Sequence, residues 1–266
     1  MSFQPVLPLS GYAGYQFLTR TMESQREAFN ESAVMARDTD YFRENISKIT
    51  SAQELVDDRR LLTVALGAFG LSDDINSRAF ILEVLEEGTI DDDALANKLS
   101  DSRYKALSKE FSLGDLGGLT AISGFADKII DRYENHQFEV AVGEQNDTFR
   151  QALNVGNALN DVLSDFEAND SRWFAIMGSP PLRSVFQSAL GIPASFASVD
   201  IDEQLVQFKK RAESYFGTSD VSDFDDPEMQ EKLVRLFLVR DEISNFSMSG
   251  ASAALSLLQS STFSYK

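Results

Sequence analysis

Cysteine is absent from the 266 residues of this chain. Its absence excludes disulfides, zinc–thiolate sites, thiol catalysis and iron–sulfur clusters held by cysteine, but it does not indicate a compartment. Histidine occurs once, as His136, which would have to serve any Ser–His catalytic pair. Because no G-x-S-x-G motif accompanies it and the surrounding helix segment is polar, we expect His136 to face solvent.

Basic residues are few: 24 Lys and Arg stand against 42 Asp and Glu, for a formal net charge of −18. An acidic surface repels phosphates, so nucleic acid and anionic membranes are poor candidates as partners. The most apolar run, residues 61–71, is shorter than the roughly 20 residues that a membrane-spanning helix needs. The N-terminal sequence also lacks the basic and apolar regions of a secretory signal peptide. We therefore expect a cytoplasmic protein, or one that leaves the cytoplasm by a route that needs no such signal.

The hydrophobic content of 43%, with 20 Phe and only 6 Pro, is enough for a sizeable core. Apolar residues recur at three- and four-residue steps along most of the chain, which is typical of helices that bury one face. The nearest approach to strand-like alternation, residues 138–142, is too short to decide and also fits a helix end. The sequence predicts an all-α protein, a bundle of about ten helices.

The segment 51–72 is the most clearly defined helix. Ser51 and Glu54 have the spacing of a capping box. Gly70 followed by Leu71 is typical of a helix that ends with glycine in the left-handed conformation. An apolar stripe connects the two ends and consists of Leu55, Leu62, Leu66 and Phe69. Because capping and packing explain all of these features, we expect this helix to belong to the core.

The domain organisation follows from composition and helix periodicity. Residues 1–14 are interpreted as an extended arm, residues 15–246 as a helical domain, and the Ser- and Ala-rich residues 247–266 as a flexible tail. Within the domain, residues 119–169 predict two long helices that turn at Gly143 and form an antiparallel hairpin.

Two units on either side of this hairpin, residues 38–116 and 170–246, carry similar signals in the same order; a helix over residues 15–37 precedes the first. Each unit opens with an aspartate, Asp38 or Asp170, three residues before an aromatic–Phe pair. A later helix in each stops at glycine followed by an aliphatic residue. The shared order favours an internal duplication. The alternative, that helical proteins reuse the same stop signals, stays open.

Three features suggest a binding site and have simpler explanations. The acidic residues 91–93 and 220–228 lack EF-hand spacing, and aspartates at helix starts are expected from capping and the helix dipole. The glycines Gly114, Gly117 and Gly118 precede a helix but lack the Lys-Ser/Thr of a P-loop, so they predict a loop. Paired carboxylates cannot be chosen among so many acids. We assign no catalytic, cofactor-binding or metal-binding residue.

Two motifs carry a resemblance: residues 58–71, DRRLLTVALGAFGL, and residues 101–104, DSRY, followed by Phe111. They are similar to the L-x-x-A-L-x-A-F-G-L helix and the later D-x-R-Y helix of the bacterial family called "domain of unknown function 1217". The resemblance extends over about residues 15–246. It implies an all-helical protein without known enzymatic activity whose gene is commonly found near flagellar genes. The charged run 57–60, which overlaps the first motif, is interpreted as a solvated or cross-helix patch.

The resemblance favours a non-enzymatic flagellum-associated protein, either a structural component or an assembly factor, that binds one or more protein partners. The lack of cysteine and of a Sec signal is compatible with flagellar export. The alternative is a cytoplasmic helical scaffold or chaperone-like module whose acidic surface binds a basic partner. An enzyme with an unrecognised site is a third hypothesis. No nucleic acid, membrane insertion or cofactor is expected, and the sequence leaves the oligomeric state open.

Overall fold

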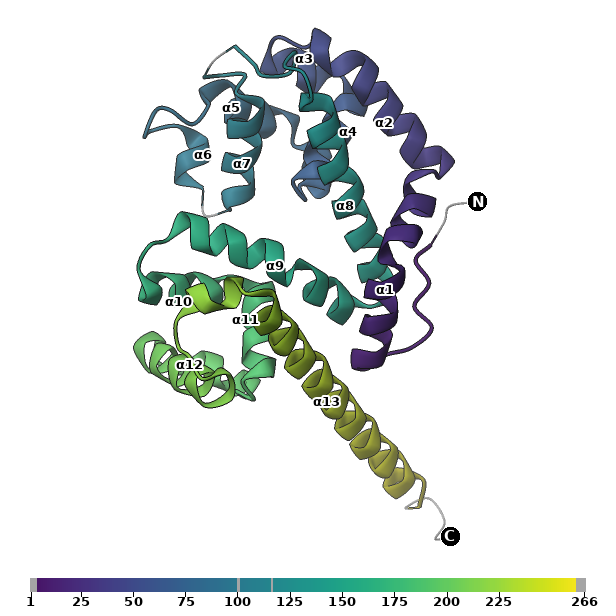
Figure 1. The fold of residues 1–266 in the computed structure, drawn as a ribbon, viewed down its shortest axis with the longest axis vertical. Coiled ribbons are helices and arrows are strands. Elements are labelled where there is room, and N and C mark those ends of the chain that lie inside the picture. The colour runs from purple at the N-terminus through teal and green to yellow at the C-terminus, as the bar shows by residue number, and fades with distance from the viewer. Residues whose placement is uncertain (1–3, 100, 116, 262–266) are drawn as a thin grey trace. The chain divides into compact units, whose positions relative to one another are not determined.

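The computed structural model describes residues 4–99, 101–115 and 117–261, with side chains described as far as Ser244. Over these ranges the chain contains thirteen α-helices, four short 3₁₀ helices and no strand (Figure 1). The predicted all-α class is confirmed, with more helices than the ten or so expected. No helix in the described ranges is both long enough and apolar enough to cross a membrane.

The chain is divided into two compact units. Unit 1 comprises Met1–Val6 and Thr21–Ala141, and unit 2 comprises Leu7–Arg20 and Val142–Lys266. The helices that supply unit 1 are α1 (Gly11–Asn30), α2 (Ala33–Asn45), α3 (Ala52–Asp57), α4 (Arg59–Ala68), α5 (Arg78–Glu87), α6 (Leu95–Lys98), α7 (Ser102–Phe111) and α8 (Phe125–Gln145). Unit 2 takes the first half of α1, the end of α8, and α9 (Asp147–Asp165), α10 (Asn169–Gly178), α11 (Pro180–Ala189), α12 (Ile201–Phe216) and α13 (Pro227–Ser261). The 3₁₀ helices are η1 (Ile46–Lys48), η2 (Ser72–Asn76), η3 (Ala194–Ser198) and η4 (Val221–Asp225).

The hairpin expected over residues 119–169 is not a separate element between two units, because the unit boundary falls within α8. Gly143, expected at the turn, lies inside α8. The turn comes at Asn146 instead, whose Oδ1 accepts the backbone N–H of Phe149 at 3.1 Å and caps α9. A Cβ on Gly143 would lie 2.4 Å from Cδ of Arg150. Glycine therefore makes room at this position for the Arg150 side chain, and it does not form the turn.

The N-terminal helices also differ from expectation. Helix α1 begins at Gly11, inside the segment 1–14 that was interpreted as an extended arm. The single helix expected over residues 15–37 is divided into α1 and α2, because Ser32 adopts an extended conformation with φ −60° and ψ 142°. Asp38, expected to open a helix, therefore lies in the middle of α2.

Helix α13 begins as predicted and ends later than predicted. Pro227 occupies its first position, after Asp226, whose carboxylate accepts a backbone N–H of the first turn at 3.4 Å. The helix continues to Ser261, through most of the segment 247–266 that was interpreted as a flexible tail. Residues 247–261 contain no proline, and their alanines and leucines favour the helix.

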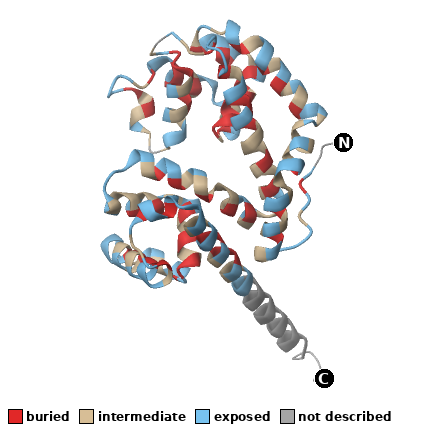
Figure 2. Ribbon diagram, in the orientation of Figure 1, coloured by how far each residue is buried: buried red, intermediate tan, exposed pale blue. Residues whose placement is uncertain are grey.

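The core of unit 1 is built around α4, as predicted. Seven of its ten residues are buried (Figure 2). Phe69, directly after the helix, lies 6.4 Å from Phe111 between ring centroids, and Phe111 packs edge to face on Phe125 at 5.2 Å. The 51–72 segment is therefore part of the core.

The helix expected over residues 51–69 is nevertheless broken at Asp58 into α3 and α4. The Asp58 backbone is extended, and its Oδ1 caps α4 by accepting the N–H groups of Arg60 and Leu61 at 3.0 and 3.1 Å. Its other oxygen accepts the hydroxyl of Tyr41 at 2.7 Å. Asp58 is thus a helix cap bound to α2, which agrees with the cross-helix alternative predicted for the charged run 57–60.

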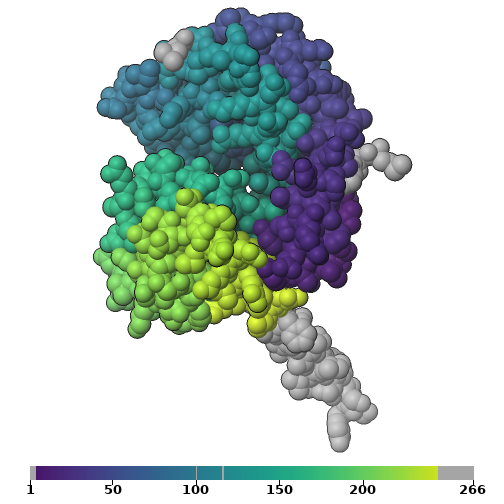
Figure 3. Space-filling view, viewed as in Figure 1, coloured from purple at the N-terminus to yellow at the C-terminus, as the bar shows by residue number. Residues whose placement is uncertain are grey.

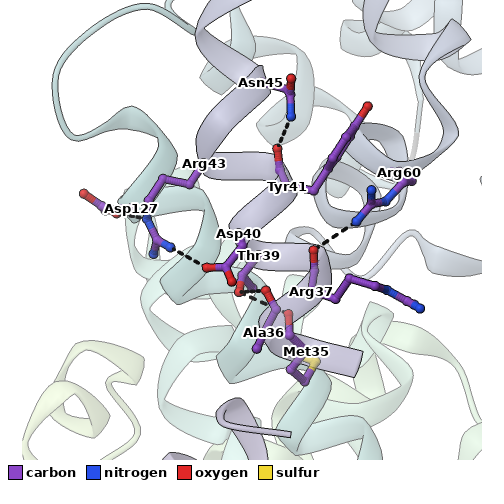
Figure 4. A network of polar contacts seen from close by, with 10 residues as sticks. All are labelled: Met35, Ala36, Arg37, Thr39, Asp40, Tyr41, Arg43, Asn45, Arg60 and Asp127. Carbon is purple, nitrogen blue, oxygen red and sulfur yellow. Dashed lines mark hydrogen bonds and ion pairs between the residues drawn. The ribbon is translucent and has the colours of Figure 1, made fainter. Parts of the chain in front are cut away.

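Further polar contacts position α2 within unit 1 (Figure 4). The guanidinium of Arg60 lies over the ring of Tyr41, with Cζ 3.7 Å from the centroid, and donates to the carbonyl of Arg37 at 3.0 Å. Arg43 pairs with Asp127 of α8 at 3.1 Å. The side chains of this ion pair are 49% and 67% exposed, so it contributes about 0–1 kcal/mol, less than we expect from the Tyr41 contacts.

The two glycine stops predicted from the sequence have the same geometry. Gly70 and Gly191 adopt φ values of 69° and 64°. In each case the following residue donates its N–H, at 2.9 Å, to the carbonyl five residues before it, which is the pattern of a Schellman motif. A guanidinium from another helix, Arg103 or Arg240, donates to a carbonyl at each helix end. Positive charge at this end of a helix is stabilising.

The aromatic pairs proposed to mark a duplication have different surroundings. In α2, Phe42 is fully buried and Tyr41 is half-buried, whereas in α10 Trp173 is fully buried and Phe174 is 37% exposed. The geometry of the glycine stops is the same in the two units, whereas the burial of the aromatic pairs differs. The duplication therefore remains a hypothesis.

Unit 2 has a core of connected aromatic rings from α10, α11, α12 and η4. Trp173 packs edge to face on Phe186 at 5.5 Å and on Phe208 at 6.1 Å. Phe224 continues the series, 5.2 Å from Phe186 and 5.1 Å from Phe216. Edge-to-face pairs of this kind are favoured by the ring quadrupoles. Helix α13 packs against α9, α11 and η4 of the same unit.

Candidate functional site

Unit 2 contains a groove of about 710 Å³ between the first half of α1, the middle of α9 and the first two turns of α13. In the space-filling view, the surface of α1 lies beside that of α13 (Figure 3). A volume of this size is typical of ligand-binding clefts. The groove is therefore the candidate functional site.

One face of α1 forms a wall of the groove. Tyr12, Tyr15, Gln16 and Thr19 line it, and their spacing of three and four residues places them on the same side of the helix. Leu18 points elsewhere and is fully buried. The polar side of α1 thus faces the groove while its apolar side packs.

Hydrogen bonds connect this wall to α13. The hydroxyl of Tyr12 donates to Oε1 of Glu231 at 3.0 Å, and Nε2 of Gln16 donates to the Tyr12 oxygen at 3.0 Å. The guanidinium carbon of Arg235 lies 5.6 Å from the centroid of the Tyr12 ring. The rim of the groove therefore presents an aromatic ring, an amide and a carboxylate in a connected arrangement.

Tyr15 lies deeper than Tyr12. Its ring packs edge to face on Phe149 at 6.1 Å, and its hydroxyl donates to the carbonyl of Ala152 at 3.5 Å. Burial raises the pKa of Tyr15 to about 12, and electrostatic interaction with Tyr12 and Glu231 acts in the same direction. Tyr15 is protonated at neutral pH, as an ordinary tyrosine is, and its hydroxyl serves there as a hydrogen-bond donor.

The raised pKa of Tyr15 predicts a loss of stability in alkali. Its folded-state pKa of about 12 exceeds the ordinary value of 10.0, so the unfolded chain loses this proton first as the pH rises. The contribution is fully present below pH 10 and disappears as the pH rises through about 12. Tyr15→Phe should therefore flatten the fall in unfolding free energy over this range, measured by urea denaturation at several pH values.

Wild-type protein provides the reference slope, because Tyr104 and Tyr133 also have a pKa raised to about 12 and are present in both proteins. Their contributions cancel in the comparison. Identical slopes for Tyr15→Phe and wild type would show that Tyr15 is not buried in the folded state.

Gly156 of α9 forms part of the floor. A Cβ at this position would lie 3.0 Å from Oε1 of Gln230 on α13, so a larger residue would fill the space between the two helices. Leu153, Val155 and Val234 supply apolar surface beside it. The combination of an apolar floor with a few polar groups suits the binding of a segment that has both kinds of surface. Because the lining contains neither histidine nor cysteine, it offers no common nucleophile–base pair.

The residues considered from the sequence lie outside this groove. We expected His136 to face solvent, but it is half-buried in α8. Its imidazole packs on Gly70, where a Cβ would lie 2.7 Å from Nε2 of His136. Asp91 accepts the N–H of Asp93 at 2.9 Å, and Asp220 caps η4. Within the described ranges, no three His, Asp or Glu residues are grouped so that they could hold a metal ion.

The glycine-rich segment considered as a phosphate cradle is a loop that supplies an anion itself. Asp115 accepts the N–H of Thr89 at 3.0 and 2.9 Å and that of Ile90 at 3.2 Å. Gly88, with φ 70°, makes room for this contact, because a Cβ there would lie 2.0 Å from Oδ1 of Asp115. The loop therefore closes the end of α5.

The family model for "Protein of unknown function (DUF1217)" matches residues 68–229, more than half of the chain. The chain belongs to this family. The match contains the DSRY motif at residues 101–104 but begins after most of the 58–71 motif. The resemblance inferred from the sequence is confirmed.

This DUF1217 protein is also similar in structure to a protein of Agrobacterium tumefaciens, known from an X-ray crystal structure of the Northeast Structural Genomics Consortium. The two are 28% identical with a TM-score of 0.71, and the similarity covers 91% of this chain and 99% of the Agrobacterium chain. No curated protein matches the chain.

None of the groove residues was recognised from the sequence. Tyr12 lay in the segment interpreted as an arm, and its partner Glu231 is 219 residues away. The available signal was the pair of tyrosines three residues apart on the polar side of a helix.

Proposed function

We propose that this DUF1217 protein is a non-enzymatic, flagellum-associated helical protein, a structural component or an assembly factor, that binds a partner protein in the groove of unit 2. The observation that carries the binding role is the groove itself, with Tyr12 and Tyr15 on its α1 wall. Tyrosine is enriched at protein interfaces because it combines a large apolar ring with a hydroxyl. The flagellar role is supported by the family resemblance and the gene neighbourhood it implies.

The groups in the groove favour binding over catalysis. The hydroxyl of Tyr15 already donates to the carbonyl of Ala152, and the carboxylate of Glu231 already accepts a hydrogen bond from Tyr12. These groups can bind backbone amides and side chains of a partner without activating a nucleophile. Fractionation separates the two flagellar roles: the protein in purified flagella supports a structural component, and its confinement to the cytosol supports an assembly factor.

Deletion of the gene in a flagellated host is expected to reduce motility and the number of filaments. Complementation with Gly156→Leu should leave these defects, because the leucine fills the groove floor. Asn157→Leu, at the next and exposed position of α9, adds the same side chain outside the groove and should restore motility. The measurements are swimming-zone diameter and filament counts.

Thr19→Trp is a second groove-filling variant, at an exposed position of α1. It keeps the test decisive if Gly156→Leu does not fold, which circular dichroism would reveal. Both groove-filling variants should fail to complement. A deletion strain with normal motility and filaments would contradict the flagellar role and favour the cytoplasmic scaffold. Full complementation by folded groove-filling variants would contradict the binding role.

A further inference from the structure

A cluster of positive charge lies in unit 2 on residues that do not line the groove. Arg211 and Tyr215 are one turn apart on α12, and Arg240 belongs to α13. Cζ of Arg240 lies 4.4 Å from the centroid of the Tyr215 ring, and Arg211 is a neighbour of Tyr215 on the same face of α12. Two cationic groups from different helices thus neighbour one phenol.

Arg240 is held in a defined position. Its Cζ lies 4.4 Å from the centroid of the Tyr215 ring, and its Nη1 donates to the carbonyl of Ala189 at the end of α11 at 2.6 Å. Gly191 allows this approach, because a Cβ there would lie 2.7 Å from Nη1. The contacts with carbonyls of α11 use Nη1 alone. The helix end thus positions the guanidinium before any ligand binds.

None of the ion pairs formed among the described residues includes Arg211 or Arg240, although the chain carries a net charge of −18. The two arginines, Arg240 first, lower the pKa of the Tyr215 phenol, whereas burial raises the pKa of Tyr15. The surroundings of the Tyr215 oxygen therefore favour negative charge.

We propose that Arg211, Arg240 and the Tyr215 hydroxyl form a binding site for an oxyanion, the phosphate or carboxylate group of a ligand. Guanidinium groups bind both kinds of group through paired N–H donors, and the phenol supplies a further O–H donor. Capping of α11 accounts for Arg240 alone. It does not account for Arg211, which is exposed.

Isothermal titration at low ionic strength tests the site with two probes, inorganic phosphate and a hexaglutamate peptide. Arg211→Gln should weaken binding about tenfold or more, the effect of losing a charge-assisted hydrogen bond. Lys210→Gln is the matched control, because it removes the same charge from the adjacent exposed position and should weaken binding less than about twofold. Circular dichroism verifies that both variants keep their helices.

The two probes distinguish the source of the oxyanion. Saturable binding of phosphate alone supports a small-anion site, and binding of the peptide supports an acidic segment of a partner. Absence of saturable binding of both probes to the wild-type chain would overturn the proposal. Equal weakening by Arg211→Gln and Lys210→Gln would also overturn it, because it would show general electrostatic attraction.

Discussion

Trp173→Ala is expected to destabilise unit 2 by about 3–5 kcal/mol. The indole is fully buried and packs edge to face on Phe186 and Phe208, so alanine would remove both ring contacts and leave a cavity. The indole Nε1 also donates to the carbonyl of Ser219 at 2.9 Å. This carbonyl would keep the hydrogen bond from Nδ2 of Asn169 at 3.0 Å, so lost packing accounts for most of the cost.

Urea unfolding followed by circular dichroism measures this cost, because Trp173 is the single tryptophan and its replacement removes the fluorescence signal. Phe174→Ala is the matched control. It changes the next residue of α10, which is 37% exposed, and should cost about 1 kcal/mol or less. Equal costs for the two variants would mean that Trp173 is not at the centre of the aromatic core.

Phe69→Ala should have an effect of similar size in unit 1, about 3–5 kcal/mol. The ring is 4% exposed, lies 6.4 Å from Phe111 and is covered by the guanidinium of Arg132, whose Cζ is 4.3 Å from the ring centroid. Alanine would remove the aromatic and cation–π contacts together. The cavity left by the ring would lie beside Gly70, where the chain leaves α4. Neighbouring residues could fill this cavity only if the end of α4 moved.

The same urea unfolding experiment applies, with Ile90→Ala as the control in unit 1. The Ile90 side chain is 72% exposed, and its truncation should change the unfolding free energy by about 0.5 kcal/mol or less. If Phe69→Ala were as mild as Ile90→Ala, the core of unit 1 would not include the end of α4.

The predictions that succeeded depend on neighbouring residues. Ser51 accepts the N–H of Glu54 at 3.3 Å, as the capping box predicts, although the Glu54 carboxylate accepts from Thr50 at 2.7 Å, one residue earlier than expected. Gly70 and Gly191 end their helices because a left-handed residue is needed there and glycine adopts that conformation without strain. The information for such features lies within one or two turns of helix.

The predictions that failed depend on distant residues. The sequence around Asp58 is compatible with a continuous helix, and the break accompanies a hydrogen bond from Tyr41, seventeen residues earlier. Helical periodicity likewise shows that α8 and α9 are long helices but not which elements they pack against. The 119–169 hairpin was therefore expected as one element, whereas the two units divide it.

The sequence by itself determined the all-α class, the glycine stops and the family, because a helical period, a left-handed glycine and a short motif are each contained in a few adjacent residues. Only the tertiary structure decided the division into two units, the groove that joins Tyr12 to Glu231, and the cluster of Arg211 with Arg240. These features bring together residues that are far apart in the chain, and contacts between distant helices leave no periodic pattern in the sequence.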